Sequence, residues 1–302
     1  MAIYSEEAFD AWRKPASETE EQKISNAISM IRDAINAHPI LKNKNTEFIV
    51  QGSYGNNTNI KVDSDIDICA MLKDTFYSEY REGAKDSDYG FVDGTNTYHD
   101  YKKWIIEALI TKFGVANITV GNKAIQIKSN SYRVQADVIA AFQFRNYKDD
   151  ISNNPNNFIE GIKFFSSDGD AIINYPKIHI RNGIQKNNDT SRKFKRTVRL
   201  YKRIRNKMKE DGIGVPRGIS SYLIEGLLWN TPNSIFNSAT SWNMLLKDSI
   251  TFLYNKTKED STCKDWGVVS EQFYLFHSSY KWSRADVNSF LVQMWNYLGY
   301  TS

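Results

Sequence analysis

Every segment with the pattern of a β-strand lies before Pro176, and beyond that proline the pattern is helical throughout. Short runs of alternating or β-branched apolar residues predict strands, whereas apolar residues spaced three and four apart predict helices. The predicted strands cover residues 46–51, 64–72, 118–120, 124–128 and 132–144, followed by a hairpin that turns at Asp168-Gly169. The predicted helices include 24–35, 101–113, 192–209, 220–229, 242–254 and 284–300. Strands with one or two helices, followed by helices alone, are typical of an α+β lobe joined to a helical lobe.

The length of the chain, 302 residues, also favours two lobes. The polar stretch 186–191 precedes the long helical region and is a natural boundary. We therefore predict an α+β lobe at residues 1–190 and a helical lobe at residues 191–302.

The composition excludes several classes of protein. Two cysteines, Cys69 and Cys263, make no disulfide scaffold, and four scattered histidines show no zinc-binding pattern. No apolar stretch approaches the ~18–20 residues that a membrane-spanning helix needs. The acidic N-terminal residues lack the apolar core of a secretory signal. We expect a soluble protein of the cytoplasm that does not bind a membrane.

The positive charge is concentrated in one predicted helix. Ten lysines and arginines, and no acidic residue, lie between Arg192 and Lys209, although the whole chain carries a net charge of only +4. Leu200, Ile204 and Met208 recur every four residues, so the segment is predicted to be an amphipathic helix with a wide basic face. Such a face can simply be solvated, but unopposed positive charge favours a polyanionic partner, either a triphosphate or a nucleic acid.

Two carboxylates alternate with two isoleucines in the predicted strand 64–72. Asp65 and Asp67 therefore share one face of the strand, while Ile66 and Ile68 point into the core. Adjacent carboxylates repel each other unless a cation lies between them. A divalent metal with oxygen ligands, most simply Mg²⁺ and alternatively Mn²⁺, fits this pair. The pattern is also compatible with an ordinary polar strand face.

Two further features strengthen the metal hypothesis. Gly52-Ser53 directly follows the strand 46–51, and the backbone N–H groups of such a turn can bind phosphate oxygens. Asp137 lies in an otherwise apolar strand, where an unpaired carboxylate is costly to bury. Asp137 is either capped by backbone amides or paired with Arg133, or it is a third metal ligand. Together these features suggest two-metal nucleotidyl transfer.

The spacing of Gly52-Ser53, Asp65-Ile66-Asp67 and Asp137 resembles that of the polymerase-β-like nucleotidyltransferases. The segments 199–202 (RLYK) and 220–225 (SSYLIE) resemble the cGAS/DncV-like nucleotidyltransferases, or CD-NTases, of bacterial anti-phage systems. This resemblance implies an α+β nucleotidyltransferase lobe with a mixed sheet, packed on a helical lobe, with the active site in the cleft between them. The residues it implies are catalytic and metal-binding Asp65, Asp67 and Asp137, and nucleotide-binding Gln51, Gly52, Ser53, Asn174, Lys202, Ser221 and Tyr222.

Within these roles, the resemblance implies that Lys202 and Ser221 bind phosphates and that Tyr222 contacts a base. The segment 173–179 (INYPKIH) and the tryptophan-rich C-terminal region are most similar to the CdnE clade. Asn174 stands where many relatives have a small hydroxyl residue, and in CdnE-like members an asparagine near this position is associated with pyrimidine selection. Asn174 can equally be a turn residue before a proline.

The resemblance implies an enzyme that joins two nucleoside triphosphates, releases pyrophosphate and cyclises the product to a cyclic dinucleotide. It further implies an anti-phage role, with a downstream effector protein activated by the product, and a monomeric enzyme that needs no nucleic acid. A tRNA, RNA or oligoadenylate nucleotidyltransferase is an alternative within the same chemistry. A catalytically inactive nucleotide-binding module is an alternative of another class.

Overall fold

The computed structural model describes residues 3–15, 18–60, 65–278, 280 and 282–300. The chain forms two compact units. The helical unit comprises Met1–Ala16, Asn56–Val62 and Ile178–Ser302, and the sheet unit comprises Ser17–Gly55 and Asp63–Lys177. The division predicted between residues 190 and 191 falls inside the helical unit. Ser64, the first residue of one predicted strand, lies outside the described residues.

The described part of the sheet unit contains one mixed sheet of seven strands. Its strands are β1 (Thr46–Gln51), β2 (Ile66–Tyr80), β3 (Ile118–Val120), β4 (Ile125–Ile127), β5 (Ala136–Tyr147), β6 (Ile159–Phe165) and β7 (Ala171–Asn174). The order is β1-β2-β5-β4-β3, and β6 pairs with a later part of β5 and with β7. Among the described strands, β2 and β5 pair in parallel and the other pairs are antiparallel. The predicted hairpin at Asp168-Gly169 is confirmed as the turn between β6 and β7.

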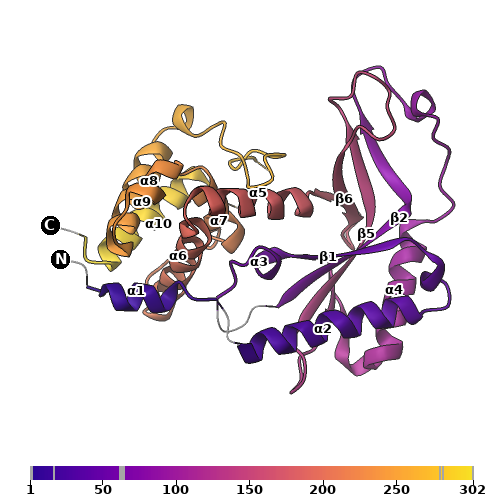
Figure 1. Ribbon diagram of the computed structural model, residues 1–302, viewed down its shortest axis with the longest axis horizontal. Helices are drawn as coiled ribbons and strands as arrows, with labels where there is room; N and C mark the ends of the chain where they lie inside the picture. Colours follow the sequence, from indigo (N-terminus) through magenta and orange to yellow (C-terminus); the bar gives the residue numbers. More distant parts are fainter. Residues whose placement is uncertain (1–2, 16–17, 61–64, 279, 281, 301–302) are drawn as a thin grey trace. The chain divides into compact units, whose positions relative to one another are not determined.

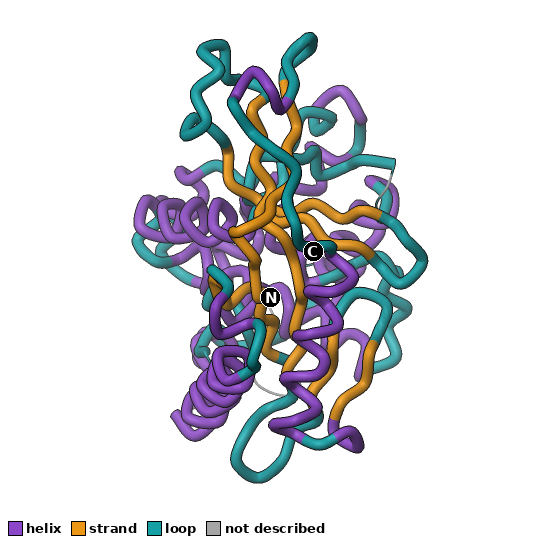
Figure 2. The backbone as a smooth tube through the Cα atoms, turned by 90° about the vertical axis from the view of Figure 1, so that its right-hand side faces the viewer, coloured by secondary structure: helices purple, strands orange, loops and turns teal. Residues whose placement is uncertain are grey.

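One face of this sheet is covered by two helices, α2 (Glu18–Ala37) and α4 (Tyr98–Phe113), which run along it in Figure 1. Ile66 and Ile68 of β2 pack there against apolar residues of both helices. Since side chains alternate along a strand, the residues between them lie on the opposite face. Figure 2 shows the strands of the sheet from a second direction, with loops extending from their ends.

The helical unit contains most of the remaining helices. They are α1 (Glu6–Trp12), α6 (Lys193–Glu210), α7 (Ser221–Trp229), α8 (Asn233–Ser238), α9 (Trp242–Thr257) and α10 (Arg284–Tyr297). α5 (Pro176–Asp189) begins at the last two residues of the sheet unit, and α3 (Gly52–Gly55) is a single turn after β1. Short 3₁₀ turns lie at Leu41–Asn43, Asp86–Tyr89, Val115–Asn117 and Asp260–Thr262. No helix among the described residues is long and apolar enough to cross a membrane.

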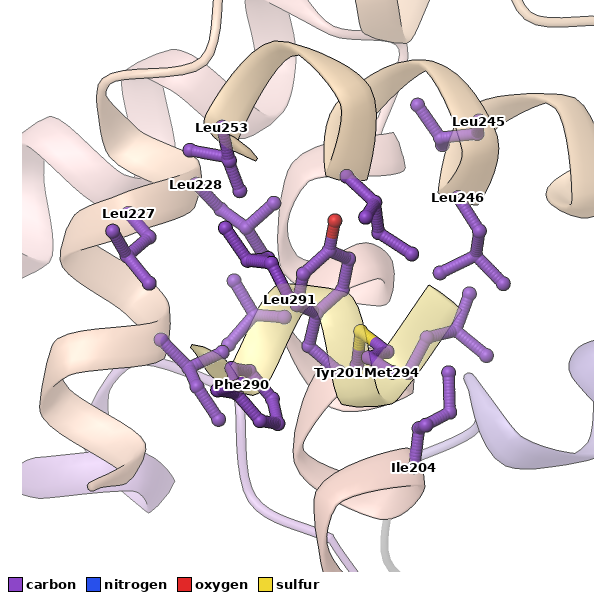
Figure 3. Packing of buried hydrophobic residues seen from close by; sticks show 14 of the residues in the cluster. Tyr201, Ile204, Leu227, Leu228, Leu245, Leu246, Leu253, Phe290, Leu291 and Met294 are labelled. Carbon is purple, nitrogen blue, oxygen red and sulfur yellow. The ribbon is translucent and has the colours of Figure 1, made fainter. Parts of the chain in front are cut away.

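The predicted apolar stripe of α6 is confirmed, because Leu200, Ile204 and Met208 are fully buried. Figure 3 shows Tyr201 in the centre of the core, among leucines of α7 and α9 and residues of α10. Its hydroxyl group shares a 2.8 Å hydrogen bond with Ser249 Oγ, which satisfies the polar atom in this apolar interior. The core thus fixes α6 along its apolar side.

Candidate active site

Two of the predicted catalytic carboxylates lie side by side on neighbouring parallel strands. Asp67 of β2 and Asp137 of β5 are direct partners in the strand register. Asp65 immediately precedes β2 and shares the face of Asp67, because Ile66 between them is buried in the core of the opposite face. The predicted division of this strand into a carboxylate face and an isoleucine face is confirmed.

The carboxylates raise one another's pKa. The pKa of Asp67 is raised to about 6, chiefly by burial and further by the negative charges of Asp137 and Asp65. Burial and the charge of Asp65 also raise the pKa of Asp137, although a hydrogen bond from Gln126 opposes this shift. Negative charge is therefore concentrated at these carboxylates.

The surroundings of Asp137 bear on its alternative interpretations. Its buried Oδ1 has no hydrogen-bond partner among the described residues. Arg133, the expected counter-ion, instead lies over the ring of Phe113, with Cζ 4.8 Å from the ring centroid. Asp137 is therefore neither fully capped nor paired with Arg133 among the described residues, and its role as a ligand for a cation stays a prediction.

The carboxylates are not a ready-made metal cage. Among the described residues, no three histidine, cysteine or carboxylate side chains are close enough together to hold a metal ion. Asp65 Oδ2 accepts a 2.9 Å hydrogen bond from Gln135 Nε2, which holds the Asp65 carboxylate in place without a metal ion. The orphaned oxygen of Asp137 and the raised pKa of Asp67 nevertheless fit a hard divalent cation, which prefers carboxylate oxygens.

The predicted Gly-Ser turn lies against the same carboxylates. Gln51, the last residue of β1, is the register partner of Asp67, and Gly52 follows it with a φ of +65°. A Cβ atom on Gly52 would lie only 1.9 Å from Asp67 Oδ2. Gly52 is therefore required both for its left-handed backbone and for the space beside Asp67. Gln51 and Gly52 thus lie beside Asp67, and Ser53 follows them in α3.

The helical unit holds three of the four remaining predicted contacts to the triphosphate and base. Ser221 is the first residue of α7, and its hydroxyl group accepts a 3.4 Å hydrogen bond from Arg205. The ring of Tyr222 lies 5.8 Å from that of His179 and 6.3 Å from that of Trp282. Lys202 differs from the expectation of an accessible cation, because it is only 1% exposed.

Lys202 belongs to a buried polar cluster that the sequence did not reveal. Its Nζ donates to Thr58 O and to Thr58 Oγ1, both at 3.0 Å. The Thr58 hydroxyl group donates to Glu225 Oε2 at 3.4 Å, and His179 Nε2 lies 3.2 Å from Glu225 Oε1. Burial lowers the pKa of Lys202 to about 8. Two of the three ammonium protons are thus bound by Thr58, and a phosphate would have to share or replace these bonds.

A second cation of α6 also points inward. Arg199 donates to the backbone oxygens of Asn57 and Arg13, and it is buried like Lys195 and Lys202. Of the ten basic residues in the segment, Arg192 and Lys209 are exposed and the others are half-buried or buried. The predicted wide basic face is therefore only partly exposed: Lys195, Arg199 and Lys202 are buried, and Arg199 and Lys202 hold the segment after the Gly-Ser turn within the helical unit. The sequence feature that could have indicated this buried cluster is Glu225, a single acidic residue in the otherwise apolar helix α7.

Asn174 is the last residue of β7 and is exposed. Across the sheet it is the register partner of Ile162, which pairs with Gln143. Gln143 and Asp137 are six residues apart on β5, so Asn174 lies on the same face of the sheet as the carboxylates. Its side-chain amide makes no hydrogen bond to any residue that the structure describes.

Residues 181–299 match the family model of the cGAS/DncV-like nucleotidyltransferase C-terminal helical domain. The chain is 44% identical to the cyclic dipyrimidine nucleotide synthase CdnE of Cecembia lonarensis, over 99% of each chain. It is 39% identical to the enzyme of the same name from Legionella pneumophila, again over 99% of each. The chain belongs to the cGAS/DncV-like nucleotidyltransferases.

A solved structure of this family extends the comparison to the fold. The Rhodothermus marinus CdnE c-UMP-AMP synthase with Apcpp and Upnpp has a TM-score of 0.85 and 27% identity, covering 99% of this chain and 98% of that one. The predicted α+β fold, the CdnE resemblance and the enzyme class are confirmed: this CD-NTase is a nucleotidyltransferase of the cyclic dinucleotide synthase type. The roles of single residues and the predicted cleft stay predictions.

Proposed function

We propose that this CD-NTase joins two nucleoside triphosphates with release of pyrophosphate and then cyclises the linear product at the same carboxylates. The observation that carries this proposal is the register pairing of Asp67 with Asp137, with Asp65 on the same face and Gly52 against Asp67. Two carboxylates on neighbouring strands, a third directly before β2 and a glycine turn beside Asp67 provide acidic oxygen ligands next to a turn that can bind phosphate.

The carboxylates supply the metal site in this proposal. Asp65 and Asp67 would hold the ion that carries the triphosphate, and Asp137 would hold the ion near the attacking hydroxyl group. When bound, Mg²⁺ or Mn²⁺ supplies charge neutralisation and a lower pKa for that hydroxyl group. The shared burial and repulsion that raise the pKa of Asp67 support this assignment, since a cation relieves both.

The remaining nucleotide contacts are assigned by position. Gln51, Gly52 and Ser53 would contact phosphates beside the carboxylates. In the helical unit, Ser221 would bind phosphate and Tyr222 would contact a base. Lys202 would contribute its remaining proton to a phosphate while Thr58 holds its ammonium group.

We assign pyrimidine selection at one of the two substrate positions to Asn174. Its exposed amide offers one donor and one acceptor, which match the adjacent N3–H and carbonyl groups of uracil. A site built for one hydrogen-bonding edge rejects the wrong base, because its polar groups are then left unpaired. Two relatives that are named dipyrimidine synthases support this choice. The product would activate a downstream effector protein in anti-phage defence, in the cytoplasm, with the enzyme acting as a monomer.

The experiment that tests the function uses the pure full-length protein. It is incubated with all four triphosphates and Mg²⁺ or Mn²⁺, without nucleic acid, and the products are identified by mass spectrometry. We expect a cyclic dinucleotide that contains at least one pyrimidine, and none from the Asp65→Ala/Asp67→Ala variant. Product that forms only after RNA is added would support an RNA nucleotidyltransferase instead. No product under any condition would support an inactive binding module.

A further inference from the structure

The position of Asn174 is set by its backbone, because its side chain forms no hydrogen bond within the described residues. Discrimination between bases requires donor and acceptor groups that are held in place. The residues that fix the backbone at the end of β7 therefore bear directly on which base is accepted. Three contacts, all within the sheet unit, fix it.

The first contact is made by the neighbouring residue, Tyr175, on the opposite face of the sheet. Tyr175 is buried, and its hydroxyl group accepts a 3.3 Å hydrogen bond from Asn146 Nδ2. Its ring packs edge-on against Phe144, with ring centroids 6.2 Å apart. Asn146 and Phe144 both belong to β5, the strand that also carries Asp137. Tyr175 thus links the end of β7 to the catalytic strand.

The second contact depends on the absence of a side chain at Gly161 of β6. A Cβ atom on Gly161 would lie 2.9 Å from the backbone oxygen of Asn174 and 3.0 Å from the ring of Tyr175. Gly161 is not among the residues with positive φ, so any amino acid could adopt its backbone conformation. The glycine is needed for space alone, and the atom that a methyl group would displace is the carbonyl of Asn174 itself.

The third contact is an ion-pair bridge at Lys177, three residues beyond Asn174. Lys177 Nζ lies 2.6 Å from Glu47 Oε1 of β1 and 2.6 Å from Glu160 Oε2 of β6. Glu160 Oε1 in turn accepts a hydrogen bond from Gln143 Nε2 of β5. The turn from β7 into α5 is therefore held directly by β1 and β6, and Gln143 of β5 holds Glu160 in place.

We propose that Gly161, Tyr175 and Lys177 are positioning residues. They hold the backbone of Asn174 in a fixed position at the end of β7 and thereby set the choice of base. This inference rests on the proposed role of Asn174 in pyrimidine selection. None of the three residues touches a base in this proposal. They act through the backbone of Asn174, so their effect is on the ratio of bases in the product.

The direct test is Gly161→Ala, which adds one methyl group against Asn174. Gly214→Ala is the matched control, because a Cβ atom on Gly214 meets nothing within 4 Å and its φ is not positive. Each protein receives equimolar UTP, CTP, ATP and GTP, and the ratio of pyrimidine to purine in the product is measured by mass spectrometry. We expect Gly161→Ala to lower this ratio by about three- to tenfold, the equivalent of one weakened hydrogen bond, and Gly214→Ala to leave it unchanged.

A double variant separates positioning from a general effect on the fold. Because Gly161 acts through Asn174, Gly161→Ala should change the ratio little further in the Asn174→Ser background. A full additional shift in that background would overturn the inference. So would a wild-type ratio in the Gly161→Ala single variant while Asn174→Ser shifts it; the role of Asn174 would then stand alone. A wild-type ratio in Asn174→Ser would refute that role, and this inference with it.

Tyr175→Phe gives a second test if Gly161→Ala fails to fold. This change keeps the buried ring and removes only the hydroxyl group that binds Asn146. We expect the ratio of pyrimidine to purine in the product to fall by about two- to fivefold, less than in Gly161→Ala. The melting temperature should change by no more than about a few degrees. An equal loss of rate on all four triphosphates, with no change in base ratio, would count against positioning.

Discussion

Replacing Thr58 by valine tests whether the buried cations of α6 hold the segment that follows the Gly-Ser turn. The change keeps the branched shape and removes one hydroxyl group. That group is fully buried; it accepts a 3.0 Å hydrogen bond from the Lys202 ammonium group and donates to the Glu225 carboxylate at 3.4 Å. Valine would leave Lys202 with the Thr58 carbonyl and deprive Glu225 Oε2 of its hydroxyl donor.

The magnitude follows from these two contacts. A hydrogen bond to a charged group contributes roughly 1.5–3 kcal/mol, and the longer contact to Glu225 adds less. We therefore expect Thr58→Val to lower the free energy of unfolding of the helical unit by about 2–3 kcal/mol. Thr197→Val is the control: Thr197 is equally buried, but its hydroxyl group donates to the Lys193 carbonyl of its own helix. Loss of that neutral bond should cost about 1 kcal/mol or less.

Urea denaturation followed by tryptophan fluorescence reports on the unfolding of the helical unit. Six of the seven tryptophans lie in the helical unit, and only Trp104 lies in the sheet unit. The reasoning is refuted if Thr58→Val loses no more stability than Thr197→Val, because the buried cluster would then contribute no more than an ordinary buried hydroxyl group.

Three further predictions concern single titratable groups. Asp67→Asn should raise the melting temperature in EDTA at pH 8, because the raised pKa of Asp67 means that its ionised form is disfavoured in the folded protein. Addition of Mg²⁺ should stabilise the wild type but not the variant. Asp137→Asn should lower kcat strongly with little change in KM for the triphosphates; a raised KM with kcat preserved would contradict the division of roles. Burial lowers the pKa of Lys186 to about 8, so the unfolded chain binds more protons between pH 8 and 10. Stability measured by urea denaturation should rise with pH in that window, and Lys186→Met should flatten the rise.

The carboxylate face could be predicted because it depends on local periodicity. Asp65, Asp67 and their flanking isoleucines are two residues apart, and a strand sends alternate side chains to opposite faces whatever it packs against. Asp137 could be predicted for a chemical reason, since an acid in an apolar strand needs a partner. In both cases a few neighbouring residues contained the information.

The surroundings of Lys202 and Asn174 could not be predicted in this way. Thr58 and Lys202 are 144 positions apart, and no pattern in either segment indicates the other. Gly161 lies in an ordinary strand sequence, and its importance appears only when β6 and β7 are aligned and Tyr175 packs over it. Contacts of this kind depend on the register between distant segments, which the periodicity of a single segment does not contain.

The burial of cations in α6 also bears on the choice between a nucleotide-specific enzyme and an RNA-dependent one. A cation that contacts a nucleic acid releases counterions, and each such contact steepens the dependence of affinity on salt. Arg199 and Lys202 already bind backbone oxygens inside the helical unit, so they are not part of an exposed surface for RNA. The ten charges of this segment therefore do not add up to a ten-charge RNA site. A shallow salt dependence of triphosphate KM, measured between 50 and 200 mM salt, agrees with a compact phosphate site; a steep one would require an extended basic surface elsewhere on the protein.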